Sequence, residues 1–468
     1  MKPQKQHKRY IPTLLKAKLD AIEHPRKDNL YVIIDMILRK EIYYKTELQK
    51  RYGFTEISKK QFKELIPSSD HLHSDMEFLV QNKYILRNDY YTIGIKCKSY
   101  KIPQEYLGKQ VPVLIQNKSI NNRITKQLAR YQIMKDKKLE FARTKYIKSF
   151  RVDTKGANRA ILSKILSEIK LLSIKKNLNL SDKEIIDILN CENNHFKNSM
   201  LLTSYNNDPE LYHILHRYMI YSTRLNAIAD GFLFFKRNDT NGRLDSNLTS
   251  LPTFLRPYII SDEKLVYIDI KNSQPFFLYT LLKNKTSVNE LELNRYAELV
   301  VSGNIYQFFK DQYEKETTYY RTIKQMKLML FKIFYSKLPS FIKYKTFFGK
   351  RFPEIMQHIN NTNSIKHNTL SVQLQSIESF FVIDVIMPTL AKHNIIPYTI
   401  HDGFICNESE AEVVKNTIIN KSMELYGIAP ALHINFLDEI VDESDDGELW
   451  DGIIDDDDTE DNDTWIIE

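Results

Sequence analysis

An Asp-Gly pair between two β-rich runs requires antiparallel strands in a chain whose composition is otherwise that of a helical protein. Asp402-Gly403 lies between residues 397–400 and residues 404–406, both rich in strand-forming side chains. Asp-Gly in this setting is a strong hairpin signal and places Asp402 at a tight turn. Only 12 of the 468 residues are glycine, which favours helices elsewhere. The sequence therefore predicts a mainly helical α+β fold with a small antiparallel sheet.

A second carboxylate follows another apolar run. Residues 265–268 are apolar and lead into Asp269, and the next apolar block has helical periodicity. This pattern predicts a strand that presents Asp269 at its exposed end and then turns into a helix. Carboxylates on adjacent strand ends can hold two Mg²⁺ ions about 3.5–4 Å apart, and Mn²⁺ could replace them. Such a pair of ions suits the activation of a 3′ hydroxyl and the stabilisation of a leaving pyrophosphate.

Residues 319–339, between the two carboxylates in the chain, have the pattern of a helix. Lys327, Phe331 and Tyr335 are spaced at i, i+4 and i+8 and share one face. A lysine for triphosphate charge, a phenylalanine for sugar packing and a tyrosine for base stacking would form a nucleotide-binding stripe. The alternative is an amphipathic core helix with Lys327 at its margin.

Charge is strongly segregated along the chain. The net charge is +8, but residues 441–468 contain 14 Asp or Glu and no Lys or Arg. The rest has 67 basic and 45 acidic residues, a net charge of +22, which favours a polyanion such as nucleic acid. A merely basic soluble protein is the alternative. We expect the acidic tail to be disordered and to compete with nucleic acid, to aid solubility or to dock a protein partner.

Composition predicts five segments. Helical spacing followed by two β-rich runs that meet at Asn88-Asp89 gives the order of a winged helix. The basic helices that follow would suit grasping a duplex, although a solvated charged face is the alternative for each of them. The segments are a basic, loose N-terminus (1–27), a winged-helix-like module (28–110), a basic helical, thumb-like region (111–235), the region of the chemical signals (236–440) and a disordered acidic tail (441–468).

Several classes of protein are not indicated. Cys97, Cys191 and Cys406 are too far apart for a disulfide framework or a zinc site, which fits a reducing cytosol and a cytoplasmic location. No run approaches the roughly 18 apolar residues of a membrane span, so no membrane association is expected. The sequence also lacks a Walker A motif and a D-x-E exonuclease signature. Glu378 and Asp384 could each supply a spare acid or serve a structural role.

Six elements occur in the order of the family A polymerases, and the resemblance covers about residues 235–438. This family includes the bacterial polymerase I group and the phage-type single-subunit RNA polymerases. The elements are Asp239-Thr-Asn-Gly242-Arg243, similar to T/D-x-x-G-R; Asp269, similar to the start of motif A; Ser302-Gly-Asn-Ile305-Tyr306, similar to G-x-D-I-Y/H; Lys327, Phe331 and Tyr335, similar to K-x3-F-x3-Y; Asn368 and Gln373, similar to N-x4-Q; and His401-Asp402, similar to motif C.

The resemblance implies a right-hand polymerase with an antiparallel-sheet palm, small fingers and a helical thumb-like region. It also implies roles for individual residues. It assigns catalysis to Asp269, Asp402 and Lys327; two Mg²⁺ to Asp269, Asp402 and the Ile270 carbonyl; nucleotide binding to Lys327, Phe331, Tyr335, Phe276, Arg321 and Lys324; and nucleic-acid binding to Arg243, Gly242, Gln373 and His401.

The helix expected at residues 319–339 corresponds to the helix of the fingers in this family. It departs from the family pattern at two positions. Ile323 stands where an arginine usually precedes the lysine, so Lys324 or Arg321 would take over its phosphate contact. Ser336 replaces the usual glycine after Tyr335.

The two aspartate motifs depart as well, and the departures bear on the product. If Ser273-Gln274 match the Ser-Gln of D-x-S-Q-I-E, two residues are inserted and Phe276 takes the place of the sugar-gating glutamate. A bulky Phe276 would exclude ribonucleotides. Gly403 follows Asp402 at the position where the DNA polymerases of this family have glutamate. The phage-type RNA polymerases also lack that glutamate, so this departure points toward RNA synthesis.

These features favour a template-directed DNA polymerase that binds a template, a primer and nucleoside triphosphates. A single-subunit DNA-dependent RNA polymerase or primase is one alternative. A non-catalytic nucleic-acid-binding replication initiator is another, and a metal-dependent nuclease would leave the Lys/Phe/Tyr stripe unexplained. A compact enzyme of this kind is compatible with a phage, a plasmid or another mobile element.

Overall fold

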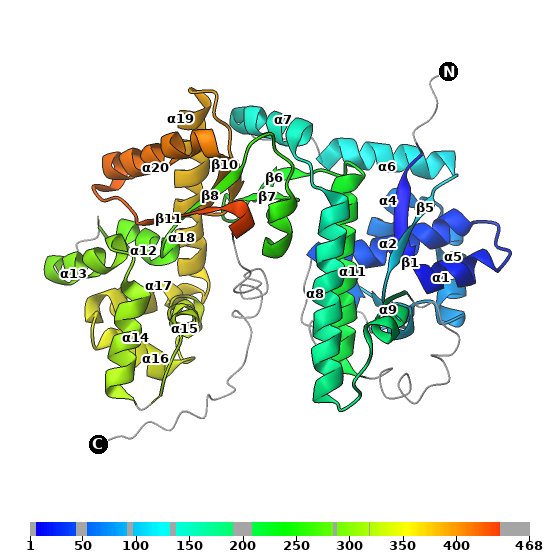
Figure 1. Cartoon of the computed structure of the whole chain (residues 1–468), viewed down its shortest axis with the longest axis horizontal. Coiled ribbons are helices and arrows are strands. Elements are labelled where there is room, and N and C mark those ends of the chain that lie inside the picture. The colour runs from blue at the N-terminus through cyan, green and yellow to red at the C-terminus, as the bar shows by residue number, and fades with distance from the viewer. Residues whose placement is uncertain are drawn as a thin grey trace. The chain divides into compact units, whose positions relative to one another are not determined.

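The computed structural model describes residues 6–43, 54–90, 97–131, 137–190, 208–283, 288–317 and 319–439. These residues form a mainly helical α+β fold with small antiparallel sheets, as predicted (Figure 1). They divide into two compact units, which we describe separately. The first unit comprises Met1–Ile133, Arg151–Phe234 and Tyr258–Ile260, and the second comprises Met134–Phe150, Phe235–Pro257 and Ser261–Glu468. The acidic tail and Cys191 lie outside the described residues.

The first unit is built around two long helices that pack against each other, α8 (Thr154–Lys175) and α11 (Pro209–Ala229). An aspartate caps the start of each helix, because Asp153 and Asp208 accept hydrogen bonds from backbone N–H groups of the first turn. Strand β1 (Lys8–Pro12) pairs with β5 (Gln110–Leu114). Other helices of this unit are α1 (Thr13–Asp20), α2 (Lys27–Tyr43), α6 (Lys118–Tyr131) and α9 (Asp182–Asn190).

A small three-stranded sheet lies within the first unit. After α2 the chain forms β2 (Thr55–Glu56), α4 (Lys59–Leu65), α5 (Ser69–Gln81), β3 (Leu86–Asn88) and β4 (Ser99–Lys101), and the sheet order is β2-β4-β3. The two β-rich runs were expected to meet at Asn88-Asp89, whereas Asn88 pairs with Ser99, which lies beyond the second run. Asp89 instead forms ion pairs with Arg87 (2.9 Å) and Lys98 (2.6 Å). Of the second β-rich run, residues 91–96 lie outside the described residues.

The second unit contains a four-stranded antiparallel sheet. Its strands are β8 (Leu265–Ile270), β9 (Tyr398–Ile400), β10 (Gly403–Asn407) and β11 (Leu432–Phe436), in the order β11-β8-β10-β9. Val266, Ile268 and Ile270 alternate with less buried residues, so β8 has one buried face. Helix α20 (Ala411–Tyr426) packs against β8 and β10. The alternation leaves Asp269 on the face of β8 opposite to the buried residues.

Helices make up most of the second unit, drawn from green to orange in Figure 1 except for α7 (Glu140–Ser149), which is cyan. The predicted succession of strand and helix after residue 265 is confirmed, because β8 is followed by α12 (Ser273–Leu282). Helix α18 (Thr369–Ser379) continues through a π-helix (Phe380–Ile386) into α19 (Met387–Ala391). The other elements are α7 (Glu140–Ser149), β6 (Phe235–Arg237), β7 (Leu244–Ser246), α13 (Glu290–Val301), α14 (Ile305–Glu316), α15 (Ile323–Tyr335), α16 (Ile342–Gly349) and α17 (Pro353–Ile365).

One helical segment of the described chain, Thr369–Ala391, is long and apolar enough to cross a membrane by length and composition alone. More than half of its most apolar window is buried inside the second unit. The same segment carries Glu378 and Asp384, which bind arginines of the β6–β7 hairpin. Burial and these ion pairs fit a core helix.

Candidate active site

Two adjacent strands present the predicted carboxylates. Asp269 lies at the end of β8 and pairs in register with Gly403, the first residue of β10. Asp402 immediately precedes Gly403, so the two aspartates meet at the same end of the sheet. The Asp269 side chain is 26 % exposed. The predicted meeting of the two carboxylates therefore follows from the antiparallel pairing of β8 with β10.

A two-residue turn positions Asp402. Ile400 pairs with Gly403, so His401 and Asp402 form the turn, and His401 has φ of 54°. The predicted tight turn is confirmed, but Gly403 belongs to the strand rather than to the turn. A Cβ atom at Gly403 would lie 2.4 Å from the Tyr267 hydroxyl oxygen on β8. Any other residue at position 403 would therefore require the Tyr267 ring to shift.

Both aspartates have a pKa above the ordinary value for a carboxyl group. Burial and the neighbouring charge of Asp402 raise the pKa of Asp269 from 3.8 to about 7. Burial also raises the pKa of Asp402, although a hydrogen bond from Ser273 at the start of α12 opposes the shift. The Asp269 Oδ1 atom is buried and has no hydrogen-bond donor among the described residues. An unsatisfied carboxylate oxygen beside a second carboxylate is an arrangement that a divalent cation would stabilise.

The donor set fits Mg²⁺ better than a transition metal. Among the residues that the structure describes, no group of three or more His, Cys, Asp or Glu side chains gathers as a metal site. Mg²⁺ is usually held by one or two carboxylates, with water and substrate phosphate oxygens completing its coordination. Asp269 and Asp402 supply the carboxylates, and Ile270, the next residue on β8, remains the predicted source of a carbonyl ligand.

Helix α15 brings a lysine to the carboxylates. The charge of Lys327 lowers the pKa of both Asp269 and Asp402, so the ammonium group lies near the pair. Phe331 and Tyr335 follow on the same face, and their rings stack 5.7 Å apart. Both rings are buried, with 4 % and 3 % of their surface exposed. The predicted shared face is confirmed, while the roles of the two rings in nucleotide binding remain predictions.

The other two cations predicted for nucleotide binding lie around the start of α15. Arg321 lies 5.7 Å from the centre of the Tyr313 ring. Lys324 is exposed in the first turn, which Thr322 and Gln325 close as a capping box.

Phe276 does not reach the site. Its side chain is fully buried in α12 and packs against Phe277 and Tyr426. The Tyr335 hydroxyl instead donates a hydrogen bond to Gln274 Oε1 at 2.7 Å. Gln274 is the fifth residue after Asp269, the position of the glutamate in D-x-S-Q-I-E when no insertion is assumed. The burial of Phe276 does not fit the sugar contact expected of it, and Gln274 is the residue of α12 that contacts Tyr335.

The β6–β7 hairpin contributes Gly242 and Arg243. Gly242 has φ of +73° and lies in the tight loop between the strands, where a Cβ atom would approach Ser379 Oγ to 2.8 Å. Arg243 forms an ion pair with Glu378 (2.7 Å), whose side chain is fully buried. Burial raises the pKa of Glu378 to about 7, against the opposite effect of Arg243. Of the other residues predicted to bind nucleic acid, His401 and Gln373 are both exposed, the first in the β9–β10 turn and the second on α18.

Two residues near the carboxylates were not singled out as site residues by the sequence. His433 on β11 pairs in register with Asp269, and its Nδ1 lies 3.5 Å from Asp269 Oδ1. Tyr306 on α14 lies near Asp402, because burial and then the Asp402 charge raise its pKa. Tyr306 belongs to the Ser302–Tyr306 stretch already noted, whereas His433 reaches the site through strand pairing, for which the sequence gives no local signal.

No family model and no curated protein matches this chain. Among solved structures it is similar to the POL domain of Pol1 from M. smegmatis in complex with DNA primer-template and dNTP. The TM-score is 0.45 and the sequence identity is 12 %, over 68 % of this chain and 74 % of that chain. A likeness at this level does not establish the family or the activity.

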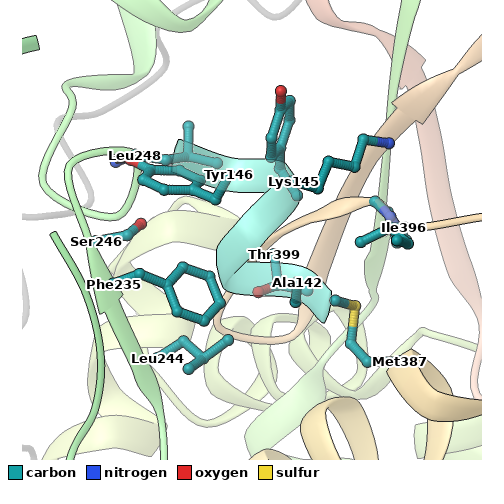
Figure 2. A pocket seen from close by; sticks show the side chains of 12 residues that line it. Ala142, Lys145, Tyr146, Phe235, Leu244, Ser246, Leu248, Met387, Ile396 and Thr399 are labelled. Atoms are coloured by element: carbon teal, nitrogen blue, oxygen red, sulfur yellow. Dashed lines mark hydrogen bonds between the residues drawn. The ribbon is translucent and has the colours of Figure 1, made fainter. Parts of the chain in front are cut away.

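A small recess elsewhere in the second unit has no such chemistry. Figure 2 shows the side chains that line it, which come from α7, the β6–β7 hairpin, the start of α19 and the segment around β9. Phe235, Leu244 and Met387 make its wall apolar, and its volume of about 10 Å³ is enough for roughly one water molecule. We therefore place the candidate active site at the two aspartates.

The raised pKa of Asp269 predicts a stability gain on substitution. A folded-state pKa of about 7 against an ordinary 3.8 means that ionisation of Asp269 destabilises the folded state as pH rises between these values. Asp269→Asn should therefore raise the free energy of unfolding at pH 8 by roughly 2–4 kcal/mol, with no gain near pH 4. Urea unfolding in EDTA at both pH values measures this, with exposed Asp262→Asn as the control. An equal change at both pH values would contradict the assignment.

Proposed function

We propose that this chain is a template-directed nucleotidyltransferase that extends a DNA strand. The observation that carries the proposal is the convergence of Lys327 with Asp269 and Asp402, two carboxylates of raised pKa. Two aspartates can hold divalent metal ions, and the metal ions together with the lysine can hold a polyanionic substrate. A nucleoside triphosphate is such a substrate, and the basic body of the chain suits the nucleic acid that it would extend.

The reaction joins the 3′ hydroxyl oxygen of a primer to the α-phosphorus of a nucleoside triphosphate and breaks the bond to the bridging oxygen, releasing pyrophosphate. Asp269, Asp402 and the Ile270 carbonyl would hold two Mg²⁺ ions, which when bound activate the hydroxyl and neutralise charge on the leaving group. Lys327 would bind the triphosphate oxygens. Tyr335 and Phe331 would border the base and sugar from α15.

Gln274 would contact the sugar. It has nearly the size of the glutamate found at this position in family A motifs, and its side chain is held by Tyr335 of the proposed nucleotide helix. A side chain of that size beside the ribose 2′ position leaves no room for a hydroxyl group, which favours deoxynucleotides. The proposed preference for DNA synthesis therefore rests on Gln274, which contacts Tyr335 of α15, rather than on Phe276, which packs against Phe277 and Tyr426.

Primer extension tests the proposed function. The protein should extend a labelled primer on a longer template with dNTPs and Mg²⁺, and should use NTPs much less efficiently. EDTA should abolish extension, because the carboxylates then lack their cations. A preference for NTPs would indicate an RNA polymerase or primase. Binding without extension would indicate an initiator, and shortening of the primer would indicate a nuclease.

We also propose that residues 28–110 form a winged helix. The order of α2, β2, α4, α5, β3 and β4 and the sheet order β2-β4-β3 support this assignment. Helix α5, the third helix of this module, contains no Lys or Arg. Binding of a DNA duplex through that helix would therefore lack the usual contacts to phosphates.

A further inference from the structure

A buried chain of polar contacts runs through the second unit beside the two aspartates. The Tyr335 hydroxyl donates to Gln274 Oε1 (2.7 Å), and Gln274 Nε2 donates to Glu378 Oε2 (2.5 Å). The other Glu378 oxygen, Oε1, lies 2.7 Å from an Arg243 nitrogen. Tyr335, Gln274 and Glu378 are each no more than 3 % exposed. This chain of contacts therefore connects four elements, α15, α12, α18 and the β6–β7 hairpin.

The carboxylate fixes the direction of this chain. Glu378 is ionised above its pKa of about 7 and then only accepts hydrogen bonds, so the Gln274 amide must turn its NH₂ group toward Glu378 and its oxygen toward Tyr335. The Tyr335 hydroxyl then has to donate to Gln274, which fixes how that hydroxyl points. With an amide at position 378, Gln274 could flip and Tyr335 could either donate or accept. The buried charge thus selects one of several possible arrangements.

We propose that Glu378 is a positioning residue that holds Gln274 and Tyr335 in the orientation required to distinguish deoxyribose from ribose, and ties them to Arg243. The inference rests on the proposed function, because Gln274 and Tyr335 are placed there against the incoming nucleotide. Glu378 itself touches neither nucleotide nor metal ligand in this arrangement. One carboxylate then links the nucleotide side of the site to the hairpin assigned to nucleic acid.

The same hairpin provides a matched control. Arg237, at the end of β6, forms a bidentate ion pair with Asp384. The two guanidinium nitrogens lie 2.8 and 2.5 Å from the two carboxylate oxygens. Asp384 lies six residues after Glu378 and binds Arg237, whereas Glu378 binds Gln274 and Arg243. Asp384→Asn therefore weakens the attachment of the hairpin to the helix without touching the polar chain. Effects specific to Glu378→Gln can be separated from a general loosening of the hairpin.

Equilibrium binding of dATP and ATP to the full-length protein, on a dideoxy-terminated primer–template with Mg²⁺, tests the inference. Glu378→Gln should lower the preference for dATP about tenfold, while Asp384→Asn should change it less than twofold. Adding Gln274→Ala to Glu378→Gln should not lower the preference for dATP any further, because the two substitutions act through the same contact. Tyr335→Phe, which removes a single oxygen atom, should reproduce the loss if Glu378→Gln does not fold.

Three outcomes overturn the inference. They are an unchanged preference in both Glu378→Gln and Tyr335→Phe, an equal loss in Asp384→Asn, and additive losses in the double variant. If the wild type extends primers while one of these holds, the inference fails and the proposed function stands. If the wild type binds nucleotide but never extends a primer, the proposed function fails and the binding ratios still decide the role of Glu378. If the wild-type protein binds neither dATP nor ATP, both the inference about Glu378 and the proposed function are overturned.

Discussion

Replacing Asp269 or Asp402 by asparagine should lower nucleotide incorporation by roughly a thousandfold or more. Asparagine keeps the shape of aspartate but loses the charge that would hold the cations, and a loss of about 4 kcal/mol of transition-state stabilisation corresponds to this factor. Binding of primer–template should change little, because the aspartates repel phosphates rather than attract them. Single-turnover incorporation and DNA binding, measured on the same preparations, separate the two effects.

The control for this pair is Asp262→Asn, which removes a carboxylate from an exposed position before β8. It should leave incorporation unchanged. If Asp269→Asn or Asp402→Asn keeps more than about a tenth of the wild-type rate, the assignment of the two carboxylates to metal binding is wrong.

Lys327→Ala should raise the nucleotide KM and lower kcat, with a combined loss of roughly 100-fold in kcat/KM. The ammonium group faces two carboxylates in the absence of substrate, and a triphosphate would bring further negative charge that the variant could not neutralise. The stability of the fold should change little, because Lys327 is only partly buried. Steady-state kinetics over a range of nucleotide concentrations, with thermal unfolding alongside, gives both quantities.

Lys332→Ala on the same helix is the matched control, because Lys332 lies over the Phe341 ring at 4.9 Å rather than beside the aspartates. Its kcat/KM should remain near that of the wild type. A Lys327→Ala protein with lower stability but normal kinetics in its folded fraction would support a core helix instead of a nucleotide site.

Local patterns were sufficient to predict the parts of the site that depend on neighbouring residues. The apolar run before Asp269 and the Asp-Gly pair at residue 402 each predict a strand end, and antiparallel pairing brings those ends together. The spacing of Lys327, Phe331 and Tyr335 likewise predicts one helical face. Helical and strand periodicity fix which residues share a face, so these predictions need no knowledge of the rest of the chain.

Contacts between distant residues could not be predicted in the same way. Gln274 meets Tyr335 and Glu378 across separations of 61 and 104 residues, and no periodicity specifies such pairs. Matching Ser273-Gln274 by residue type led to Phe276, whereas the position relative to Asp269 leads to Gln274. The expected junction at Asn88-Asp89 differs for a related reason, since Asn88 pairs with Ser99 beyond the second β-rich run. His433 enters the site only because β11 pairs with β8.

The Tyr267 ring limits how this site could change through mutation. It fills the space beside Gly403, so a third acid after Asp402 cannot appear through a single substitution unless the ring also moves. A smaller residue at position 267 would remove this conflict, but by itself it would leave a hole on the face of β8, an inner strand of the sheet. A glutamate at position 403 therefore fits only where the Tyr267 ring moves aside or a smaller residue replaces it. An engineered Gly403→Glu variant should accordingly be made together with Tyr267→Ala.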